Sequence, residues 1–104
     1  ANDIVKYIDE NYYDPNLSLT KLGEVFDMSV SSLSKLFKAV TGINYSEYLC
    51  RTRMEQAKLL LKDTEKSIGI IANEVGYENE YSFRRAFRRY EGITPNEYMQ
   101  TNVQ

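Results

Sequence analysis

Apolar residues along the chain recur at intervals of three and four positions, which is the spacing of one face of an α-helix. Near the N-terminus, Ile4, Ile8 and Tyr12 predict a helix over about residues 3–13 that closes before Pro15. No stretch of the sequence alternates with a period of two, so strands are not expected. The pattern as a whole predicts an all-α chain of seven helices.

Residues that favour helix ends stand where the apolar periods begin and stop. Four of the predicted helices follow a residue whose side chain can cap them: Ser18, Ser29, Asn79 and Thr94. Gly42 and Gly92 stand just past predicted helix ends, where a left-handed residue is common. The six helices after the first are predicted at about 19–26, 30–41, 45–62, 68–75, 80–91 and from Pro95 onward. Two inward faces carry Leu33, Leu36, Phe37 and Val40, and Phe83, Ala86, Phe87 and Tyr90.

The chain contains an internal repeat. Residues 19–48 match residues 68–98, with an offset of 49 positions before the turn and 50 after it. Each copy consists of a short helix, a turn that is one residue longer in the second copy, and a longer helix. This is the layout of a helix-turn-helix unit, whose second helix enters the major groove of DNA. Apolar spacing alone would suit any pair of packed antiparallel helices equally well.

The outward faces of the longer helices are polar and basic. They carry Ser31, Ser34, Lys35 and Lys38 in the first copy, and Tyr81, Ser82, Arg84, Arg85, Arg88 and Arg89 in the second. Short hydroxyl side chains let a helix sit deep in a groove, and Lys or Arg can reach guanine edges or phosphates. Solvated helix faces normally mix acids with bases, so four arginines within six residues indicate an anionic partner.

Charge alternates in blocks along the chain, although the net charge is −2. Residues 1–34 hold two basic and six acidic residues, whereas residues 35–62 hold six and two. Residues 63–83 then hold one and five, and residues 84–104 hold four and two. A weakly acidic chain can therefore still present basic faces to a nucleic acid.

Composition argues against several other classes of protein. With no histidine and one cysteine, the chain lacks the commonest general base and a metal cage, so we expect no enzyme, metal or cofactor. The apolar content of 42% suits a packed core, and no apolar run approaches the roughly 18 to 20 residues that span a bilayer. The polar N-terminus does not resemble a signal peptide. We expect a cytoplasmic, nucleoid-associated protein without a membrane partner.

The long predicted helix separates the two copies. Its 18 residues would span about 27 Å at roughly 1.5 Å each. With the flanking turns, the two recognition helices would lie about one DNA turn apart, roughly 34 Å. We therefore predict a first helix-turn-helix subdomain over 1–43, a linker helix over 44–62 and a second subdomain over 63–104. A single chain would place helices 30–41 and 80–91 in successive major-groove segments.

Residues 17–98 resemble the DNA-binding domain of AraC/XylS-type bacterial transcription regulators. Three segments carry the resemblance: LSLTKLGEVFDMSVSSLSKLFKAVTG, YLCRTRMEQAKLLL and SIGIIANEVGYENEYSFRRAFRRYEGITPNEY. The last is similar to the family signature I-A-x-x-V-G-[FY], followed by F-x-x-x-F and G-x-x-P. The resemblance implies two homeodomain-like helix-turn-helix subdomains on one long helix, and promoter binding that recruits or blocks RNA polymerase. It also implies an N-terminal sensory or receiver domain in a longer protein, of which we expect this chain to be the C-terminal part.

The resemblance further implies which residues contact double-stranded DNA. Base contacts are expected from Ser31, Ser34, Lys35, Glu80, Tyr81, Ser82 and Arg85. Phosphate contacts are expected from Lys38, Arg53, Arg84, Arg88 and Arg89, and from the helix starts at Ser29, Asn79 and Pro95. For Arg53, pairing with Glu47 or Glu55 is an equally good interpretation. We expect the second unit to hold DNA tightly and the first to contribute more to the choice of sequence.

Four positions depart from the family pattern, and one of them is Met99, where an arginine usually follows the last aromatic residue. Gly23 replaces the usual alanine and is expected to loosen the first unit, because glycine costs roughly 1 kcal/mol in a helix interior. Gly69 stands where an acidic residue is common, and Glu80 stands where the side chain is often small or an amide. Glu80 can either accept a hydrogen bond from cytosine N4 or repel phosphate.

One alternative function remains open at this point. A helical protein-interaction module would contact RNA polymerase or a partner regulatory domain without specific DNA binding. The acidic blocks of the chain favour this alternative slightly.

Overall fold

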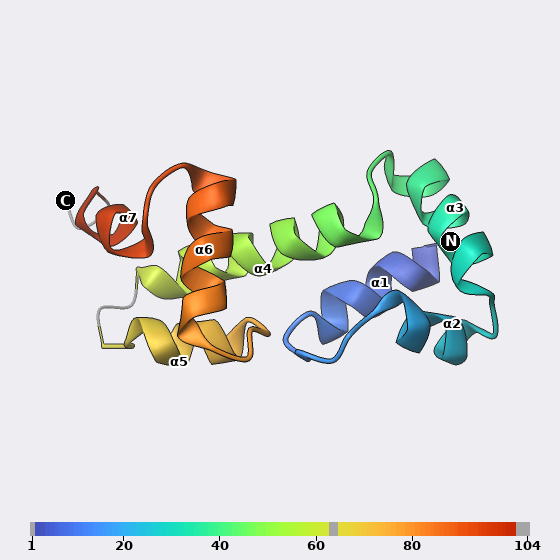
Figure 1. The fold of residues 1–104 in the computed structure, drawn as a ribbon, viewed down its shortest axis with the longest axis horizontal. Helices are drawn as coiled ribbons and strands as arrows, with labels where there is room; N and C mark the ends of the chain where they lie inside the picture. The colour runs from blue at the N-terminus through green and yellow to red at the C-terminus, as the bar shows by residue number, and fades with distance from the viewer. Residues whose placement is uncertain (1, 63–64, 102–104) are drawn as a thin grey trace.

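The structure, a computed structural model, describes residues 2–62 and 65–101 and contains seven helices and no strand within those ranges (Figure 1). The helices are α1 Asn2–Asn11, α2 Leu19–Phe26, α3 Val30–Thr41, α4 Tyr45–Leu61, α5 Ile68–Glu74, α6 Glu80–Glu91 and α7 Pro95–Thr101. The all-α fold is confirmed, and so are the bounds predicted for α3 and α6. The predicted boundary at residue 63, between the linker helix and the second subdomain, lies outside the described residues.

The first helix is shorter than predicted. It ends at Asn11 rather than near residue 13. The Asn11 side chain donates a hydrogen bond to the Tyr7 carbonyl at 2.8 Å, and the Asn11 carbonyl accepts one from the Asp14 N–H at 3.1 Å. These bonds turn the chain before Pro15, so the helix ends about two residues earlier than predicted.

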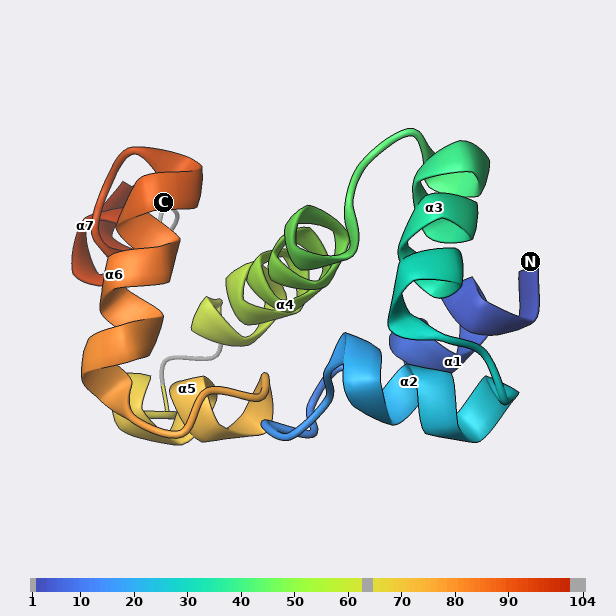
Figure 2. The same cartoon turned by 45° about the vertical axis from the view of Figure 1, so that its right-hand side comes forward.

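The molecule is elongated, with principal extents of 45 × 22 × 20 Å, and α4 connects its two ends. The first helix-turn-helix unit, α2 and α3, lies at one end, and the second, α5 and α6, lies at the other. Figures 1 and 2 show that α3 and α6 run in the same direction, from the lower to the upper part of each view. The two units are therefore arranged in tandem along α4.

Two hydrophobic clusters hold the units to α4. The first cluster consists of Ile4, Ile8, Leu17, Leu22, Leu33, Phe37, Tyr45 and Leu49. The second consists of Met54, Ala57, Leu61, Ile68, Ile71, Ala72, Val75, Phe83 and Phe87. Complete burial of one large apolar side chain is worth about 1.5 to 3 kcal/mol. Because the N-terminal half of α4 joins one cluster and its C-terminal half joins the other, each unit has its own core on a shared helix.

The inward faces predicted for α3 and α6 are one turn too long. Val40 is 42% exposed and Tyr90 is 38% exposed. The buried members on these helices end at Phe37 and Phe87, so the last turns extend beyond the two clusters. Tyr90 has a polar contact instead, since its hydroxyl donates to Glu55 Oε2 on α4 at 3.4 Å.

The predicted helix caps are confirmed. The side chains of Ser18, Ser29 and Asn79 each accept a hydrogen bond from a backbone N–H in the first turn of the following helix. Thr94 Oγ1 accepts from the Glu97 N–H at 3.1 Å, and Glu97 Oε1 accepts from the Thr94 N–H at 2.9 Å. This reciprocal pair is a capping box. Short helices such as α7 depend on such caps because a few turns alone are marginal in water.

The turns of the two units repeat the same hydrogen bond. The Met28 N–H donates to the Gly23 carbonyl, and the Tyr77 N–H donates to the Ala72 carbonyl, both at 2.9 Å. The residue before each donor is left-handed, with φ of +53° at Asp27 and +105° at Gly76. The two turns therefore match through Tyr77, and the extra residue of the second turn is Glu78.

Gly23 has a structural role that the sequence pattern did not indicate. A Cβ atom added to this buried glycine would lie 2.6 Å from the backbone oxygen of Met28. The expectation that Gly23 loosens the unit is therefore wrong: its missing side chain lets the turn close directly against α2. The matching Ala72 shows that the second turn leaves room for a methyl group.

We expect Gly23→Ala to destabilise the domain by about 1 to 3 kcal/mol, because the backbone oxygen of Met28 would have to move to admit the methyl group. Helix propensity alone would give the opposite sign, a gain of roughly 1 kcal/mol. Urea unfolding followed by circular dichroism measures the difference. The control is Ala72→Gly at the matching position of the second unit, for which we expect a decrease in the free energy of unfolding. A stabilised Gly23→Ala domain would contradict the packing argument.

Candidate nucleic-acid interface

Two phenylalanines fix which face of α6 is exposed. Phe83 and Phe87 are completely buried. The Phe83 ring lies edge-on to Tyr77 at 5.8 Å between centroids, and the Phe87 ring lies edge-on to Tyr98 at 5.7 Å. Such edge-to-face pairs add about 0.5 to 1.5 kcal/mol beyond the burial of area. The opposite face of α6 must therefore point to solvent.

The C-terminal end of α6 is attached to α4 by ionic contacts. Lys58 of α4 lies between two carboxylates, with its Nζ 2.9 Å from Glu55 Oε2 and 3.1 Å from Glu91 Oε2. The hydrogen bond to Glu55 and that to Glu91 raise the pKa of Lys58, although partial burial opposes the rise. Lys58 therefore stays charged across the physiological range and keeps Glu91, the last residue of α6, against α4.

The exposed face of α6 carries an aromatic residue and most of the arginines. Tyr81 is 69% exposed, and the guanidinium carbon of Arg85 lies 5.6 Å from the centre of its ring. The exposed residues expected to contact DNA on this helix are Glu80, Tyr81, Ser82, Arg85, Arg88 and Arg89. Arg84 is partly buried. An open hollow of about 260 Å³ lies on this face, lined by Tyr81, Arg84, Arg85, Arg88, Thr94 and Pro95.

Glu80 pairs with an arginine of the same helix. Its Oε2 lies 2.7 Å from Arg84 Nε. A Cβ atom added at Gly69 of α5 would lie 3.0 Å from Glu80 Oε1, so the two departures from the family pattern are neighbours in space. The small residue at 69 leaves room for the larger acid at 80. Glu80 thus offsets part of the positive charge of α6, a contact at i,i+4 spacing that the sequence could have revealed.

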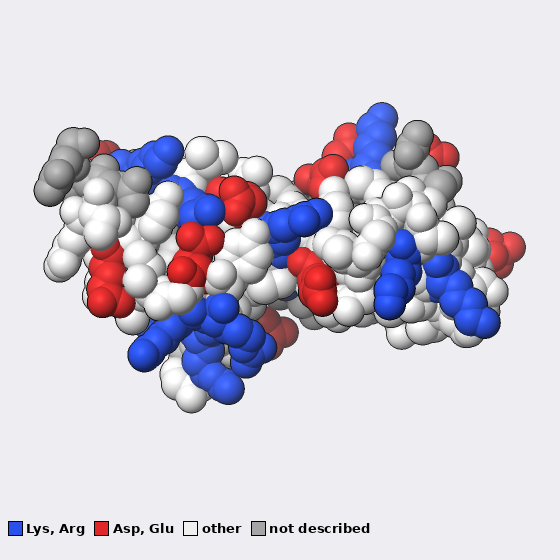
Figure 3. Space-filling view, turned by 90° about the horizontal axis from the view of Figure 1, so that it is seen from above, with Lys and Arg blue, Asp and Glu red and all other residues white. Residues whose placement is uncertain are grey.

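The exposed face of α3 is less basic. Leu33 and Phe37 are buried in the first cluster. The opposite face presents Ser31, Lys35 and Lys38 to solvent, with Ser34 partly buried. The basic side chains of α3 and of α6 project from the same edge of the molecule (Figure 3). A partner that lies along this edge would therefore meet both helices.

Arg53 is not available for a phosphate contact, which corrects one prediction. It is only 9% exposed, and its Nε and Nη2 donate to the backbone oxygens of Tyr12 and Asp14. The alternative interpretation, pairing with Glu47 or Glu55, does not describe these contacts either. A local pattern could not show this, because the acceptors lie about 40 residues earlier in the chain.

Pro95 is the second correction. Its side chain is completely buried, and proline has no backbone N–H. The neighbouring N–H groups of Thr94 and Glu97 are already donated within the capping box. Pro95 and the two N–H groups of the capping box therefore do not donate to a phosphate, and a phosphate contact at the start of α7 through the exposed Asn96 stays a prediction. Ser29 and Asn79 are exposed and cap α3 and α6, so the starts of those helices remain candidates.

Among residues 2–62 and 65–101, every helix is too short or too polar to span a bilayer. Within these ranges, no three Cys, Asp or Glu side chains are grouped so that they could hold a metal ion.

Comparison with known proteins gives consistent results. The sequence profile described as a helix-turn-helix domain matches residues 22–101. The HTH-type transcriptional regulator YtdP of Bacillus subtilis (strain 168) is 32% identical over 99 residues. That alignment includes 95% of this chain but only 13% of YtdP, so the chain spans a small part of the length of this relative.

Two solved structures have the same fold. The C-terminal domain of AraT, a response regulator from Geobacillus stearothermophilus, matches with a TM-score of 0.96 and 33% identity, over 99% of this chain and 85% of that one. The C-terminal domain of the two-component response regulator yesN from Fusobacterium nucleatum matches with a TM-score of 0.91 and 41% identity, over 94% and 95%. The tandem units and their exposed basic helices define a helix-turn-helix DNA-binding domain. Within that class, the chain belongs to the AraC/XylS-type family of bacterial transcription regulators.

We expect Glu80→Gln to strengthen DNA binding about threefold for all sequences, because it removes an anion from the basic face and frees Arg84. The lost ion pair is exposed and is worth at most about 1 kcal/mol, so folding should be little affected. Fluorescence anisotropy with a labelled duplex measures the affinity. Glu78→Gln, an exposed acid just before α6, is the matched control. Weaker binding confined to sites with a cytosine at one position would show instead that Glu80 accepts from a base.

Proposed function

We propose that this domain binds double-stranded DNA sequence-specifically by placing α3 and α6 in two successive major-groove segments, and that it regulates transcription in this way. One observation carries the proposal. The second helix of each helix-turn-helix unit buries its apolar face and exposes hydroxyl and basic side chains on the same edge of the molecule (Figure 3). Base edges are read in the major groove by such side chains, and phosphates are bound by Lys and Arg.

The length of α4 suits this arrangement. Its 17 residues span about 26 Å at roughly 1.5 Å each. One turn of DNA rises about 34 Å, and the flanking turns supply the remaining separation. The common direction of α3 and α6 allows both helices to approach one side of the duplex.

The two recognition helices would contribute unequally. Phosphates would be bound by Lys38 of α3, by Arg84, Arg88 and Arg89 of α6, and at the helix starts Ser29 and Asn79. Bases would be read by Ser31, Ser34 and Lys35 of α3 and by Tyr81, Ser82 and Arg85 of α6, while Glu80, which was also expected to contact a base, pairs with Arg84. Helix α6 has more positive charge with which to bind the DNA backbone, whereas α3 has short hydroxyl side chains that suit close contact with base edges.

Further partners belong to the whole regulator. We propose that an N-terminal sensory or receiver domain precedes this domain, because the AraT and yesN structures are C-terminal domains of response regulators. RNA polymerase would be the partner through which bound protein changes transcription, and the protein would associate with the nucleoid. A protein-interaction module without DNA binding is the less favoured function, because it leaves the four arginines of α6 without a role.

We expect DNA binding to weaken steeply with salt. If Lys38, Arg84, Arg88 and Arg89 each neutralise one phosphate, the slope of log affinity against log salt is about −3 to −4. Anisotropy titrations between low and physiological salt, on a sequence selected from a random DNA pool, measure this slope. Lys6→Ala, an exposed lysine of α1, is the control and should leave it unchanged. A slope near zero, or no enriched sequence, would contradict DNA binding.

Arg85 and Lys38 should give different defects. We expect Arg85→Ala to relax the base preference at one position by about 1 to 3 kcal/mol, because a base contact is lost. Lys38→Ala should weaken all sequences alike and reduce the salt slope by about one. Affinities for a panel of single-base variants of the selected site distinguish the two outcomes. Equal effects of both substitutions on every sequence would contradict the assigned roles.

A further inference from the structure

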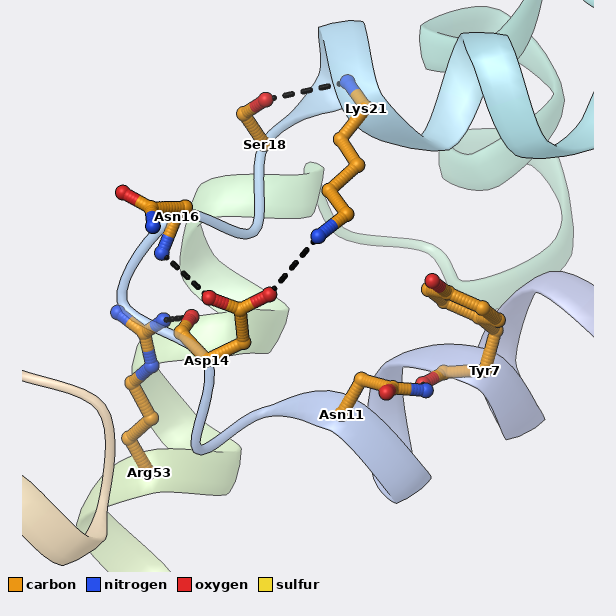
Figure 4. A network of polar contacts seen from close by, with 7 residues as sticks. All are labelled: Tyr7, Asn11, Asp14, Asn16, Ser18, Lys21 and Arg53. Atoms are coloured by element: carbon orange, nitrogen blue, oxygen red, sulfur yellow. Dashed lines mark hydrogen bonds and ion pairs between the residues drawn. The ribbon is translucent and has the colours of Figure 1, made fainter.

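Arg53 of α4 holds a segment of the first subdomain. Its Nε donates to the Tyr12 carbonyl at 2.8 Å. Its Nη2 donates to the Asp14 carbonyl at 2.9 Å (Figure 4). Both carbonyls belong to the connection between α1 and α2. One planar guanidinium therefore fixes two points of a loop that has no regular structure.

The same guanidinium contacts the second helix-turn-helix unit. Its carbon lies 5.4 Å from the ring centre of Tyr77, in the turn between α5 and α6. The Tyr77 ring in turn packs on Phe83 of the recognition helix. Arg53 thus lies between the loop of the first subdomain and the turn of the second, and it contacts both.

The backbones of the two parts also come close together. A Cβ atom added at Gly76 would lie 2.5 Å from the Tyr12 carbonyl oxygen and 2.7 Å from Arg53 Nε. Gly76 has φ of +105°, which side chains rarely adopt. No other residue would allow this approach without displacement of the loop or the turn. We call Tyr12, Asp14, Arg53, Gly76 and Tyr77 the inter-unit junction.

The loop on the first side of the junction is held in place by its own contacts. The Asp14 carboxylate accepts from the Asn16 N–H at 2.9 Å and from Lys21 Nζ at 3.0 Å (Figure 4). These hydrogen bonds lower the pKa of Asp14, so the carboxylate stays charged at neutral pH. The loop is therefore tied to α2 through Lys21, and movement of the loop would be passed on to the first helix-turn-helix unit.

The junction adds to what the two clusters fix. Each cluster packs one unit on its own half of α4, so the clusters fix how far apart the units are, and the partly buried side chain of Tyr12, a junction residue, packs against both clusters. The contact between the α1–α2 loop and the α5–α6 turn lies away from the axis of α4. It therefore opposes rotation of one unit about that axis relative to the other unit. The angle between α3 and α6 follows from this rotation.

We propose that the inter-unit junction sets the rotation of α6 relative to α3, and that Arg53 is thereby a positioning residue for the spacing of the two DNA segments that one chain reads. This inference rests on the proposed binding through both recognition helices. Each base pair inserted between the two segments turns the second by about 34° and moves it by about 3.4 Å. A domain with a fixed angle should tolerate no such insertion, whereas a domain without the junction should adapt to it.

The test compares duplexes that differ only in spacing. The selected site is footprinted to locate its two segments, and one base pair is then inserted or removed between them. For the unaltered domain we expect each change to weaken binding at least about tenfold, comparable with the loss of a base contact. A selected site with only one protected segment, or unaltered binding to all spacings, would overturn the proposal.

Arg53→Lys is the first variant, because lysine keeps the charge but cannot form both hydrogen bonds while stacking on Tyr77. We expect this variant to bind the original site more weakly. We also expect its spacing penalty, the loss of affinity when one base pair is inserted or removed between the two segments, to fall to about threefold or less. Gly76→Ala is the second variant; it keeps the arginine, but its methyl group would meet both the Tyr12 carbonyl oxygen and Arg53 Nε, so the turn has to move away from the loop. Circular dichroism and urea unfolding establish that the variants are folded.

Arg51→Lys is the matched control. It is the same substitution two residues earlier on α4, at an exposed arginine that stacks on Tyr48 of the same helix. We expect it to keep the spacing penalty of the unaltered domain. If folded Arg53→Lys and Gly76→Ala domains also keep the full penalty, α4 alone sets the angle and the junction has no part in spacing. If the unaltered domain enriches no DNA sequence, the proposed function itself fails.

Discussion

The structure depends on one helix that is buried in two cores at once. Leu49 of α4 packs in the first cluster, and Met54, Ala57 and Leu61 pack in the second. Because an α-helix rises by a constant amount per residue, these positions fix the distance between the cores to within the length of a side chain. The packing of each unit on α4, together with the inter-unit junction, then determines the orientation of both recognition helices. A substitution that bends or shortens α4 would disturb both units together.

The two faces of each recognition helix have different roles: the buried apolar face stabilises the fold, and the basic face is exposed to solvent. The phenylalanines and leucines that face α4 are nearly inaccessible to solvent, and the basic residues that face outward contribute little to stability. The net charge of −2 is compatible with an anionic partner because the acidic residues are largely elsewhere in the chain. Glu80 and Glu91 are the acids at the two ends of α6: the first pairs with Arg84 and the second with Lys58. Acids next to the basic face therefore have partners of their own.

Local rules of helix formation predict most of this fold. Hydrophobic period, caps and glycine stops give the bounds of α3 and α6, because these features act within a few residues of one another. The exposed Ser, Lys and Arg faces follow from the same period, so most of the candidate DNA contacts could be named from the sequence.

The contacts that could not be predicted involve atoms outside the helix that carries the residue. The sequence around Arg53 suggests a surface arginine, because its hydrogen-bond acceptors are backbone carbonyl groups of the distant α1–α2 loop. Judged by helix propensity, Gly23 only weakens α2. Its structural role is to leave room for the backbone oxygen of Met28, which a side chain at this position would meet. Val40 and Tyr90 continue an apolar period, but the period does not tell where the packing partner ends. In each case the deciding atom belongs to another element.

The parallel course of α3 and α6 has a consequence for how the domain would sit on a chromosome. In a two-fold symmetric dimer the recognition helices run in opposite senses, and the DNA site is a palindrome that looks the same from either end. Here the units follow each other head to tail, with different surfaces on the first and the second. A site read by both helices has no such symmetry. The bound domain would therefore have one direction along the duplex. Reversing the DNA site would reverse this direction, so any attached domain would then face the opposite way along the DNA.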